Sequence, residues 1–278
     1  MAVVIGLVSV LTMQCDFSDM WDDDHDGKYT ATAAFNYSIP ADEQIGFSIA
    51  GVSGDIQITG TGDQSRVIVQ GERMVRADSR SRADDGLDDL QVMIEKSDTL
   101  ITVYTDQPES SDNVEYIVNY QVEMPAAWIC FAGNVNGDFV IDSLDNDCTA
   151  NNINGDIWIG HVNDANIYAS GLNGDITFID IHGNVTAQII NGDIDGQISI
   201  PLNGVCQLTM VNGDIDLEIP KATSATLSAA VSNGNITLND LVLNNRVVTP
   251  TTLTGRLGEG RGIIHLAGTN GNINIGGY

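Results

Sequence analysis

Short runs of alternating apolar and polar residues recur along most of the chain. From Ile215 to Ile219, for example, the apolar residues Ile215, Leu217 and Ile219 alternate with two acids. A period of two predicts a strand with one buried face. A period of 3.6 residues, typical of an amphipathic helix, is almost absent. The pattern therefore predicts an all-β chain.

A turn precedes each of these runs, and its sequence repeats. Asn-Gly-Asp-Ile begins at Asn154, Asn173, Asn191 and Asn212, and related copies begin at Ser53, Asn136, Asn233 and Asn270. The glycines at 137, 155, 174, 192, 213 and 234 are 18, 19, 18, 21 and 21 residues apart. A fixed period near 20 residues indicates a solenoid. We therefore expect a single-stranded β-solenoid, or β-helix, with about 18–21 residues per coil and less regular strands on its N-terminal side.

Residues that did not define this alignment test it. Seven positions before the glycines stand Cys130, Cys148, Ile167, Val185, Cys206, Leu227 and Ile264. Five positions before stand Ala132, Ala150, Ala169, Ala187, Leu208, Ala229 and Leu266. Both columns are apolar, so we expect them to face the core. The aspartate of each turn then points outward.

The turn asparagines are expected to stack as a structural ladder. Its members are Asn136, Asn154, Asn173, Asn191, Asn212, Asn233 and Asn270. Stacked amides can bond to one another and to turn backbone, which satisfies groups that a tight corner leaves unpaired. Ligand binding by the ladder is the alternative.

Three segments are expected along the chain: an export segment at 1–15, an acidic linker at 16–27 and a β-solenoid domain at 28–278. Within the domain, residues 28–125 predict less regular strands, 126–240 regular coils, and 241–278 a glycine-rich loop and a terminal coil. We expect a loop or short helix over 76–89, a hairpin over 90–103, and a hairpin or loop over 244–262.

The first residues predict export. Met1 to Met13 is apolar and uncharged, too short for a helix of about 20 residues that spans a membrane, and similar to the apolar region of a signal peptide. Cys15 suggests a lipidated N-terminus, although Gln14 and Thr12 depart from the usual cleavage pattern. Ordinary signal cleavage and an uncleaved apolar anchor are the alternatives. All three place the protein in the cell envelope, in the periplasm or on the outer surface.

The formal charge of the chain limits which partners are expected. The chain carries a net charge of −27, and no Lys or Arg lies between Lys96 and Lys221. Such a surface disfavours nucleic acid and anionic lipid headgroups, so membrane attachment is expected only through an N-terminal anchor. The run Asp22 to Gly27 resembles half of a calcium-binding loop, but Ala33 stands where a chelating Glu is needed. A solvated linker is the expected structure.

One outward column of acids is a candidate metal site: Asp138, Asp156, Asp175, Asp193 and Asp214. Carboxylates about 4.8 Å apart repel by about 0.9 kcal/mol in water and about 3.5 kcal/mol at an effective dielectric of about 20. Hydration, splaying, partial protonation or bridging cations would relieve this cost. Calcium suits carboxylates and turn carbonyls. A calcium-stabilised column is therefore the hypothesis, and a solvated acidic edge is its alternative; no other cofactor is expected.

A disulfide between Cys130 and Cys148 is also a candidate. The two stand in the same inward column on adjacent coils, at a separation of about 4.8 Å that a disulfide allows. Exported chains meet oxidising conditions. The alternative is that both are small core residues, as Cys206 is expected to be.

No catalytic residues are predicted. His161, His182 and His265 stand alone, without a Ser or Cys partner in a motif. A polysaccharide-degrading β-helix enzyme would need a basic residue beside a calcium site, and the coil region has none. We expect the protein not to be an enzyme.

The repeated Asn-Gly-Asp-Ile turns resemble those of a bacterial family of β-strand-repeat domains of unknown function named "putative adhesin". The resemblance includes Val122-Glu123-Met124-Pro125 before the first regular copy and the glycine-rich loop before Gly271-Asn272-Ile273. It covers roughly residues 35–277 and implies an exported or membrane-anchored protein.

The resemblance and the pattern together predict a non-enzymatic adhesin or structural module of the envelope that binds a surface polymer or protein. Trp158 is one expected contact, and a homo-oligomer could form through the end coils. The alternatives are a calcium-dependent polysaccharide-binding module and, from another class, a polysaccharide-degrading enzyme.

Overall fold

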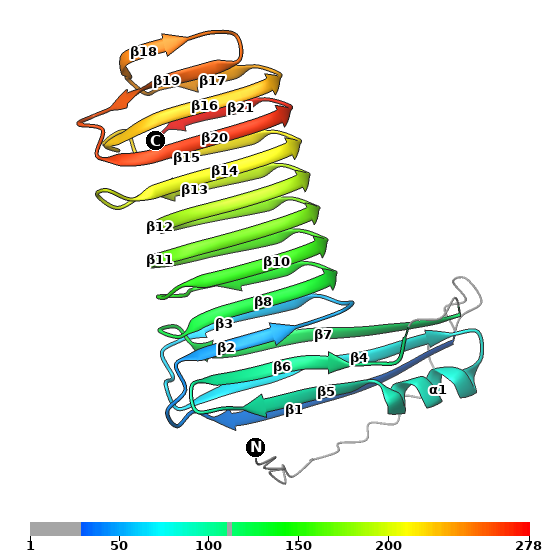
Figure 1. Cartoon of the computed structure of the whole chain (residues 1–278). Helices are drawn as coiled ribbons and strands as arrows, with labels where there is room; N and C mark the ends of the chain where they lie inside the picture. Colours follow the sequence, from blue (N-terminus) through cyan, green and yellow to red (C-terminus); the bar gives the residue numbers. More distant parts are fainter. Residues whose placement is uncertain (1–28, 110–112) are drawn as a thin grey trace.

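The computed structural model describes residues 29–109 and 113–278 of the chain (Figure 1). Within these ranges the chain forms 21 strands and one helix, α1 (Arg80–Asp89). The protein is all-β, as the alternating pattern predicts. The export segment, Cys15 and the acidic linker lie outside the described residues, and the predictions made for them stay predictions.

Most of the strands form a stack with two faces. The front face in Figure 1 consists of parallel strands, in spatial order β2 (Gly46–Ala50), β8 (Ile129–Asn136), β10 (Cys148–Asn154), the second halves of β11 (Ile157–Asn173) and β12 (Ile176–Asn191), β14 (Val205–Asn212), β20 (Gly262–Asn270) and β16 (Ala225–Asn233).

The rear face follows the same order. Its strands are β3 (Ile56–Thr61), β9 (Phe139–Asp142), the first halves of β11 and β12, β13 (Ile194–Ser199), β15 (Ile215–Ile219), β21 (Ile273–Gly277) and β17 (Ile236–Asn239). A corner of the Asn-Gly-Asp type leads from each front strand to the next rear strand. We call a front strand, its corner and its rear strand a rung.

The rungs stack in the register that the glycine alignment predicts. Cys130 pairs with Cys148, and Cys148 with Ile167, while Ala150 pairs with both Ala132 and Ala169. Every member of the two predicted apolar columns is buried. Because inward residues of both faces join one cluster, burial of these columns holds the register: a slip of one residue would turn each strand's apolar side to solvent.

Glycine is required at the corners by the close approach of neighbouring rungs. Gly192 has a φ of 143°, in the region that residues with a side chain rarely adopt. A Cβ there would overlap the carbonyl oxygen of Gly174, the corner glycine one rung away. The corner is therefore glycine for two reasons, its backbone angle and the neighbour it touches.

The order of the rungs differs from the order in the sequence at both ends. The rung of residues 262–277 lies between the rung of 205–219 and that of 225–239, because β20 pairs with both β14 and β16. The terminal coil expected within residues 241–278 is thus a rung inserted between two earlier ones, and it does not add to the end of the stack. The 37-residue gap from Asn233 to Asn270 spans a single stacking step.

A matching insertion occurs near the beginning of the chain. β2 lies between β8 and β6 (Leu100–Asp106), and β3 lies between β9 and β7 (Val114–Pro125). The corner at Gly54 separates β2 from β3. Each inserted rung is hydrogen-bonded on both sides, so neither is an exposed edge.

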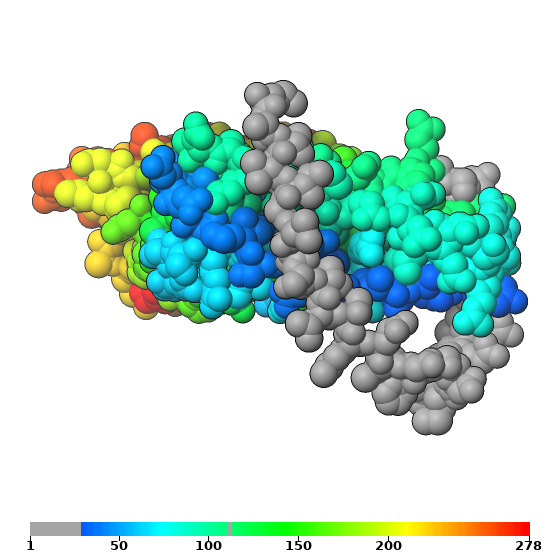
Figure 2. All heavy atoms as spheres, turned by 90° about the horizontal axis from the view of Figure 1, so that it is seen from below, coloured from blue at the N-terminus to red at the C-terminus, as the bar shows by residue number. Residues whose placement is uncertain are grey.

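Antiparallel strands cover the first end of the stack on both faces and the other end on the front face; the last rear strand, β17, pairs with β21 and has no further partner among the described strands. At the first end, β4 (Arg66–Ala77) pairs with β7, β1 (Tyr29–Pro40) with β4, and β5 (Gln91–Lys96) with β6. At the other end, β19 (Thr252–Leu257) pairs with β16, and β18 (Asn244–Val248) with β19. Figure 2, viewed from the first end, shows the blue and cyan part of the chain spread over the stack. Covered ends limit strand addition by other chains.

The helix is one of the two structures predicted for residues 76–89. Its buried residues, Ala83 and Gly86, face the long strands, and Ala83 packs in a small cluster with Ala31 and Ala77. It lies against β1 and β4, beside the end of the stack in Figure 1.

Replacing Gly192 by Ala tests the corner geometry. We expect the free energy of unfolding to fall by about 3 kcal/mol, because left-handed strain costs about 1–3 kcal/mol and the overlap with Gly174 adds to it. Gly133→Ala is the control, since a Cβ there meets nothing within 4 Å; we expect a change within about 0.5 kcal/mol. Urea unfolding measures both. Equal stability of the two variants would contradict this account.

Candidate functional site

The turn asparagines form a continuous column along one edge of the stack. The side-chain amide of Asn154 donates to Asn136 Oδ1 at 2.8 Å, and that of Asn173 donates to Asn154 Oδ1 at 2.8 Å. The same bond continues from Asn191, Asn212, Asn270 and Asn233, at 2.8–2.9 Å. Each amide between the two ends of the ladder is both donor and acceptor, whereas Asn136 only accepts and Asn233 only donates, so these side chains serve the fold.

The aspartates of the corners form a second column. Oδ1 of Asp138 accepts the backbone N–H of Asp156 at 2.9 Å, and the pattern repeats from rung to rung. At one end of the column, Asp55 Oδ1 accepts the backbone N–H of Asp138. At the other end, Asp214 Oδ1 accepts the backbone N–H of Asn272. Each carboxylate therefore satisfies a backbone donor that the tight corner leaves without a strand partner, which explains why acids persist there despite their mutual repulsion.

The calcium hypothesis for Asp138, Asp156, Asp175, Asp193 and Asp214 stays a prediction. Over residues 29–109 and 113–278, no group of three or more His, Cys, Asp or Glu side chains is placed to hold a metal ion. The aspartates stand in a single file, one per rung, with an oxygen of each turned to the backbone. A cation would bind between neighbouring rungs rather than in a closed cage.

Substitutions at Asp193 separate the hydrogen bond from the charge. Asp193→Asn keeps the acceptor for Asp214 N, as Asn272 does for Asn235 N at 3.2 Å, and removes repulsion along the column. We expect the Asn variant to be at least as stable as the native chain. Asp193→Ala loses the acceptor and is expected to be less stable than the Asn variant by about 1 kcal/mol.

The measurement is thermal unfolding at low and high salt. The advantage of Asn over Asp is expected to shrink as salt screens the column, while the deficit of Ala relative to Asn persists. An Ala variant as stable as the Asn variant would show that the hydrogen bond contributes nothing.

The rear face carries a further acidic cluster that the sequence analysis did not single out. Asp195 on β13 pairs with Asp216 on β15, whose carboxylate accepts the amide of Asn274 on β21 at 2.6 Å. Partial burial, then the charges of Asp216 and the corner residues Asp193 and Asp175, raise the pKa of Asp195 above its ordinary value of 3.8. These residues stand three positions after the corner glycines, a column that the same alignment contains.

Because the pKa of Asp195 is raised, we expect Asp195→Asn to increase the stability of the fold by an amount that depends on pH. The charged form is disfavoured in the folded state, so its cost is absent below pH 3.8 and develops as the pH rises through the folded pKa. We expect the variant to melt at a higher temperature than the native chain at pH 7, with the difference vanishing near about pH 3. A melting difference independent of pH would contradict the assignment.

Trp158 and the hydrogen-bonded pair of His161 and Asp142 lie near the other turn of the rungs. The ring of Trp158 lies over Gly160, where a Cβ would overlap it, and 6.2 Å from the ring of His161. His161 Nδ1 lies 2.7 Å from Asp142 Oδ1, and this hydrogen bond raises the pKa of the imidazole. Trp158 is thus half-buried against its own strand rather than projecting from the surface.

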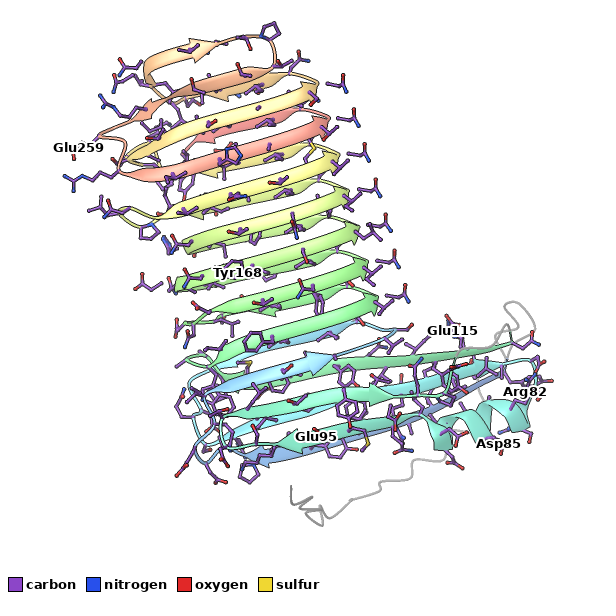
Figure 3. All side chains as sticks on the ribbon, viewed as in Figure 1. Arg82, Asp85, Glu95, Glu115, Tyr168 and Glu259 are labelled. Carbon is purple, nitrogen blue, oxygen red and sulfur yellow. The ribbon has the colours of Figure 1, made fainter. Side chains whose placement is uncertain are left out.

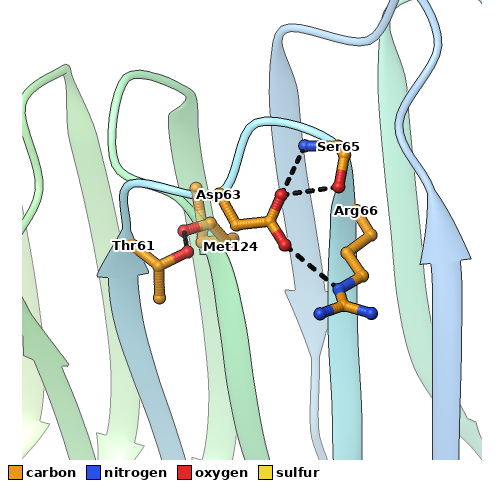
Figure 4. Close-up of polar contacts among 5 residues, drawn as sticks. All are labelled: Thr61, Asp63, Ser65, Arg66 and Met124. Atoms are coloured by element: carbon orange, nitrogen blue, oxygen red, sulfur yellow. Dashed lines mark hydrogen bonds and ion pairs between the residues drawn. The ribbon is translucent and has the colours of Figure 1, made fainter.

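A polar hollow of about 400 Å³ lies beside this pair, lined in part by Ser143, Asp145, His161 and Asn163. The loop after β3 forms the opposite wall of the hollow. Asp63 stabilises this loop, because its carboxylate accepts hydrogen bonds from Ser65 N at 2.9 Å and from Arg66 Nε at 3.1 Å (Figure 4). The hydroxyl of Ser65 also bonds Asp63 and lowers its pKa. The hollow is open and His161 of the imidazole–carboxylate pair lines it, but no nucleophile is bonded to that pair in the described residues.

Two cysteines of the inward column, Cys130 and Cys148, lie side by side on adjacent rungs. Cys130 and Cys148 are register partners and both are buried as free thiols. A hydrogen bond to Cys130, with burial, raises the pKa of Cys148, and burial raises that of Cys206 to about 12. The placement is the one that the disulfide prediction requires, and the bond itself stays a prediction.

These features define an all-β repeat protein whose polar corner residues stabilise its backbone. The family model described as Toastrack DUF4097 matches residues 38–276, and the chain belongs to this family, a domain of unknown function. The resemblance drawn from the Asn-Gly-Asp turns is therefore confirmed at the level of the family. No curated protein matches the chain.

Several solved structures are similar at low identity. A putative cell adhesion protein from Clostridium sporogenes is 11% identical, with 89% of this chain and 100% of that chain covered and a TM-score of 0.39. A putative adhesin from Bacteroides fragilis is 13% identical, with coverages of 88% and 97% and a TM-score of 0.34. A putative lipid binding protein from Parabacteroides distasonis is 10% identical, with coverages of 87% and 96% and a TM-score of 0.32. At TM-scores this low the likeness carries no functional conclusion.

The described part of the chain has no helix long and apolar enough to cross a membrane. Its single helix has 10 residues.

Proposed function

We propose that the protein is a non-enzymatic module of the bacterial cell envelope, with an adhesive or structural role. In this proposal the stacked rungs are the coils of a β-solenoid of about 18–21 residues each, and the chain is exported by its N-terminal segment. The observation that carries the proposal is the use of the repeated polar residues. Asn amides bond to Asn amides, and Asp carboxylates bond to backbone N–H groups. Residues committed to the backbone in this way build a scaffold rather than a reaction site.

The rear face is the surface that we assign to the envelope partner. It carries Asp142, Asp180, Asp195, Asp216 and Glu218 along its rungs, beside the aspartate column at the corners. A row of carboxylates on a rigid, flat support favours an extended partner with cationic or cation-bridged groups, and it repels anionic ones. The partner would be a surface polymer or a protein of that chemistry.

Binding to whole bacterial cells tests this assignment. The triple change of Asp142, Asp195 and Asp216 to Asn removes three charges from the rear face. We expect it to weaken binding about tenfold, equivalent to about 1.4 kcal/mol, and to reduce the salt dependence. The matched control changes Asp84, Asp85 and Asp88 of α1 to Asn, which removes the same charge away from the rungs.

Weakening by both triple variants alike would mean that only net charge matters, and no weakening by either would place the binding surface elsewhere. Export is tested separately, by the intact mass and membrane fractionation of the full chain made in a Gram-negative host. A chain beginning at Cys15 with added acyl mass supports the lipid anchor, whereas an uncleaved chain in the cytoplasmic fraction contradicts export.

A further inference from the structure

The front face differs from the rest of this acidic molecule because its strands carry no charged side chain. The eight front-face segments, from β2 to β16, contain no Asp, Glu, Lys or Arg; besides the buried cysteines, their titratable groups are His265 on β20 and the phenol of Tyr168 on β11. The whole chain has 38 acidic residues and a net charge of −27. In Figure 3 the labelled charged residues Glu95, Glu115 and Glu259 lie toward the two ends of the stack, and Tyr168 lies on the front face between them.

An aliphatic stripe runs across this uncharged face. Two positions before each corner glycine, the outward side chains are Val135, Ile153, Leu172, Ile190 and Val211, exposed by 36%, 43%, 39%, 44% and 38%. They stand on five neighbouring rungs in one register, because the asparagine that follows each of them is paired with the next. Contiguous exposed apolar residues in a soluble domain mark an interaction surface.

The face also has a projection and a hollow. Tyr168 is 53% exposed on β11. A groove of about 380 Å³ lies between the stripe and its neighbours, lined in part by Ser170, Gly171, Leu172 and Ile190. A surface with both a projecting ring and an adjacent groove has the features from which a self-complementary, two-fold interface can be made.

We propose that the front face is the interface of a homodimer, in which a second copy of this chain packs its front face against the first. Three observations point to a second copy. Two chains of charge −27 repel, and the front face is the approach that keeps the acids of the rear face and corners in water on the outside. A second copy also presents the same column of side chains with the same rise of about 4.8 Å per rung, so the two stripes match along their length.

The third observation is area. A front strand such as β10 has 7 residues, or about 23 Å at about 3.3 Å per residue. Eight rungs at about 4.8 Å add about 38 Å in the other direction. The product, about 870 Å² per partner, is near the roughly 800 Å² per partner of a stable interface. This dimer differs from one through the end coils, where antiparallel strands cover every outermost strand of the stack except β17.

One pair of substitutions on the same strand tests the proposal. Ile190→Asp places a charge in the stripe, and Ile179→Asp places the same charge on the rear face of β12, where Ile179 is 37% exposed. Sedimentation velocity of the full chain is measured from about 1 to 100 µM, since interfaces of this size bind in the micromolar range or tighter. We expect the native chain and Ile179→Asp to sediment as dimers, and Ile190→Asp to dissociate at least tenfold more readily.

A milder variant separates lost contacts from lost folding. Ser232 and Thr269 occupy the stripe's position on the last two rungs, so Ile190→Thr is compatible with the fold. We expect it to melt like the native chain and to weaken the dimer less than Ile190→Asp does. A native chain that remains monomeric at the highest concentration overturns the proposal. Dimers that both Asp variants leave intact, or that both disrupt equally, overturn it as well.

Discussion

Neighbouring corners touch through their backbones, and the stack depends on this contact. At each corner a glycine with a positive φ leaves room for the carbonyl of the adjacent rung. The asparagine before it and the aspartate after it then bond to their equivalents, side chain to side chain and side chain to backbone. Three consecutive residues thereby fix the angle of the turn, the spacing of the rungs and their register. The apolar columns can pack as a continuous core because this edge is held in line.

The same constraint divides the surface of the molecule. Outward positions on the front strands are free of charge, whereas the corners and the rear strands carry a large part of the acids of the rungs. Successive residues of a strand point alternately to the core and to solvent. The outward residues can therefore differ between the front face and the rear face without any change in the core. A charged face suited to an envelope partner and an uncharged face suited to a second copy are compatible on one scaffold.

Much of the regular region could be predicted, because one alignment on glycine places Cys148 beside Cys130 and Ala150 beside Ala132. Local pattern also predicts the hairpin over 90–103 and, each as one of two alternatives, the short helix over 76–89 and the hairpin over 244–262. The spatial order of the rungs could not be predicted: β20 and β16 have equivalent columns, and either could pair with β14 by pattern alone. Asp195 and the stripe at Leu172 and Ile190 are not predicted, although the same alignment contains their columns, because the period-two pattern shows which residues face outward and not which outward residues lie side by side with a shared chemistry.

The most direct test of the account is a cross-link across the inserted rung. Gln207 on β14 pairs with His265 on β20, and His265 pairs with Ser228 on β16. Cysteines introduced at Gln207 and His265 are therefore about 4.8 Å apart at Cα, whereas those at Gln207 and Ser228 are separated by two steps, about 9.6 Å. Peptide mass mapping after mild oxidation should find a disulfide in the first pair and none in the second. A disulfide between positions 207 and 228, with none between 207 and 265, would show that the rungs stack in sequence order and would contradict the structure described above.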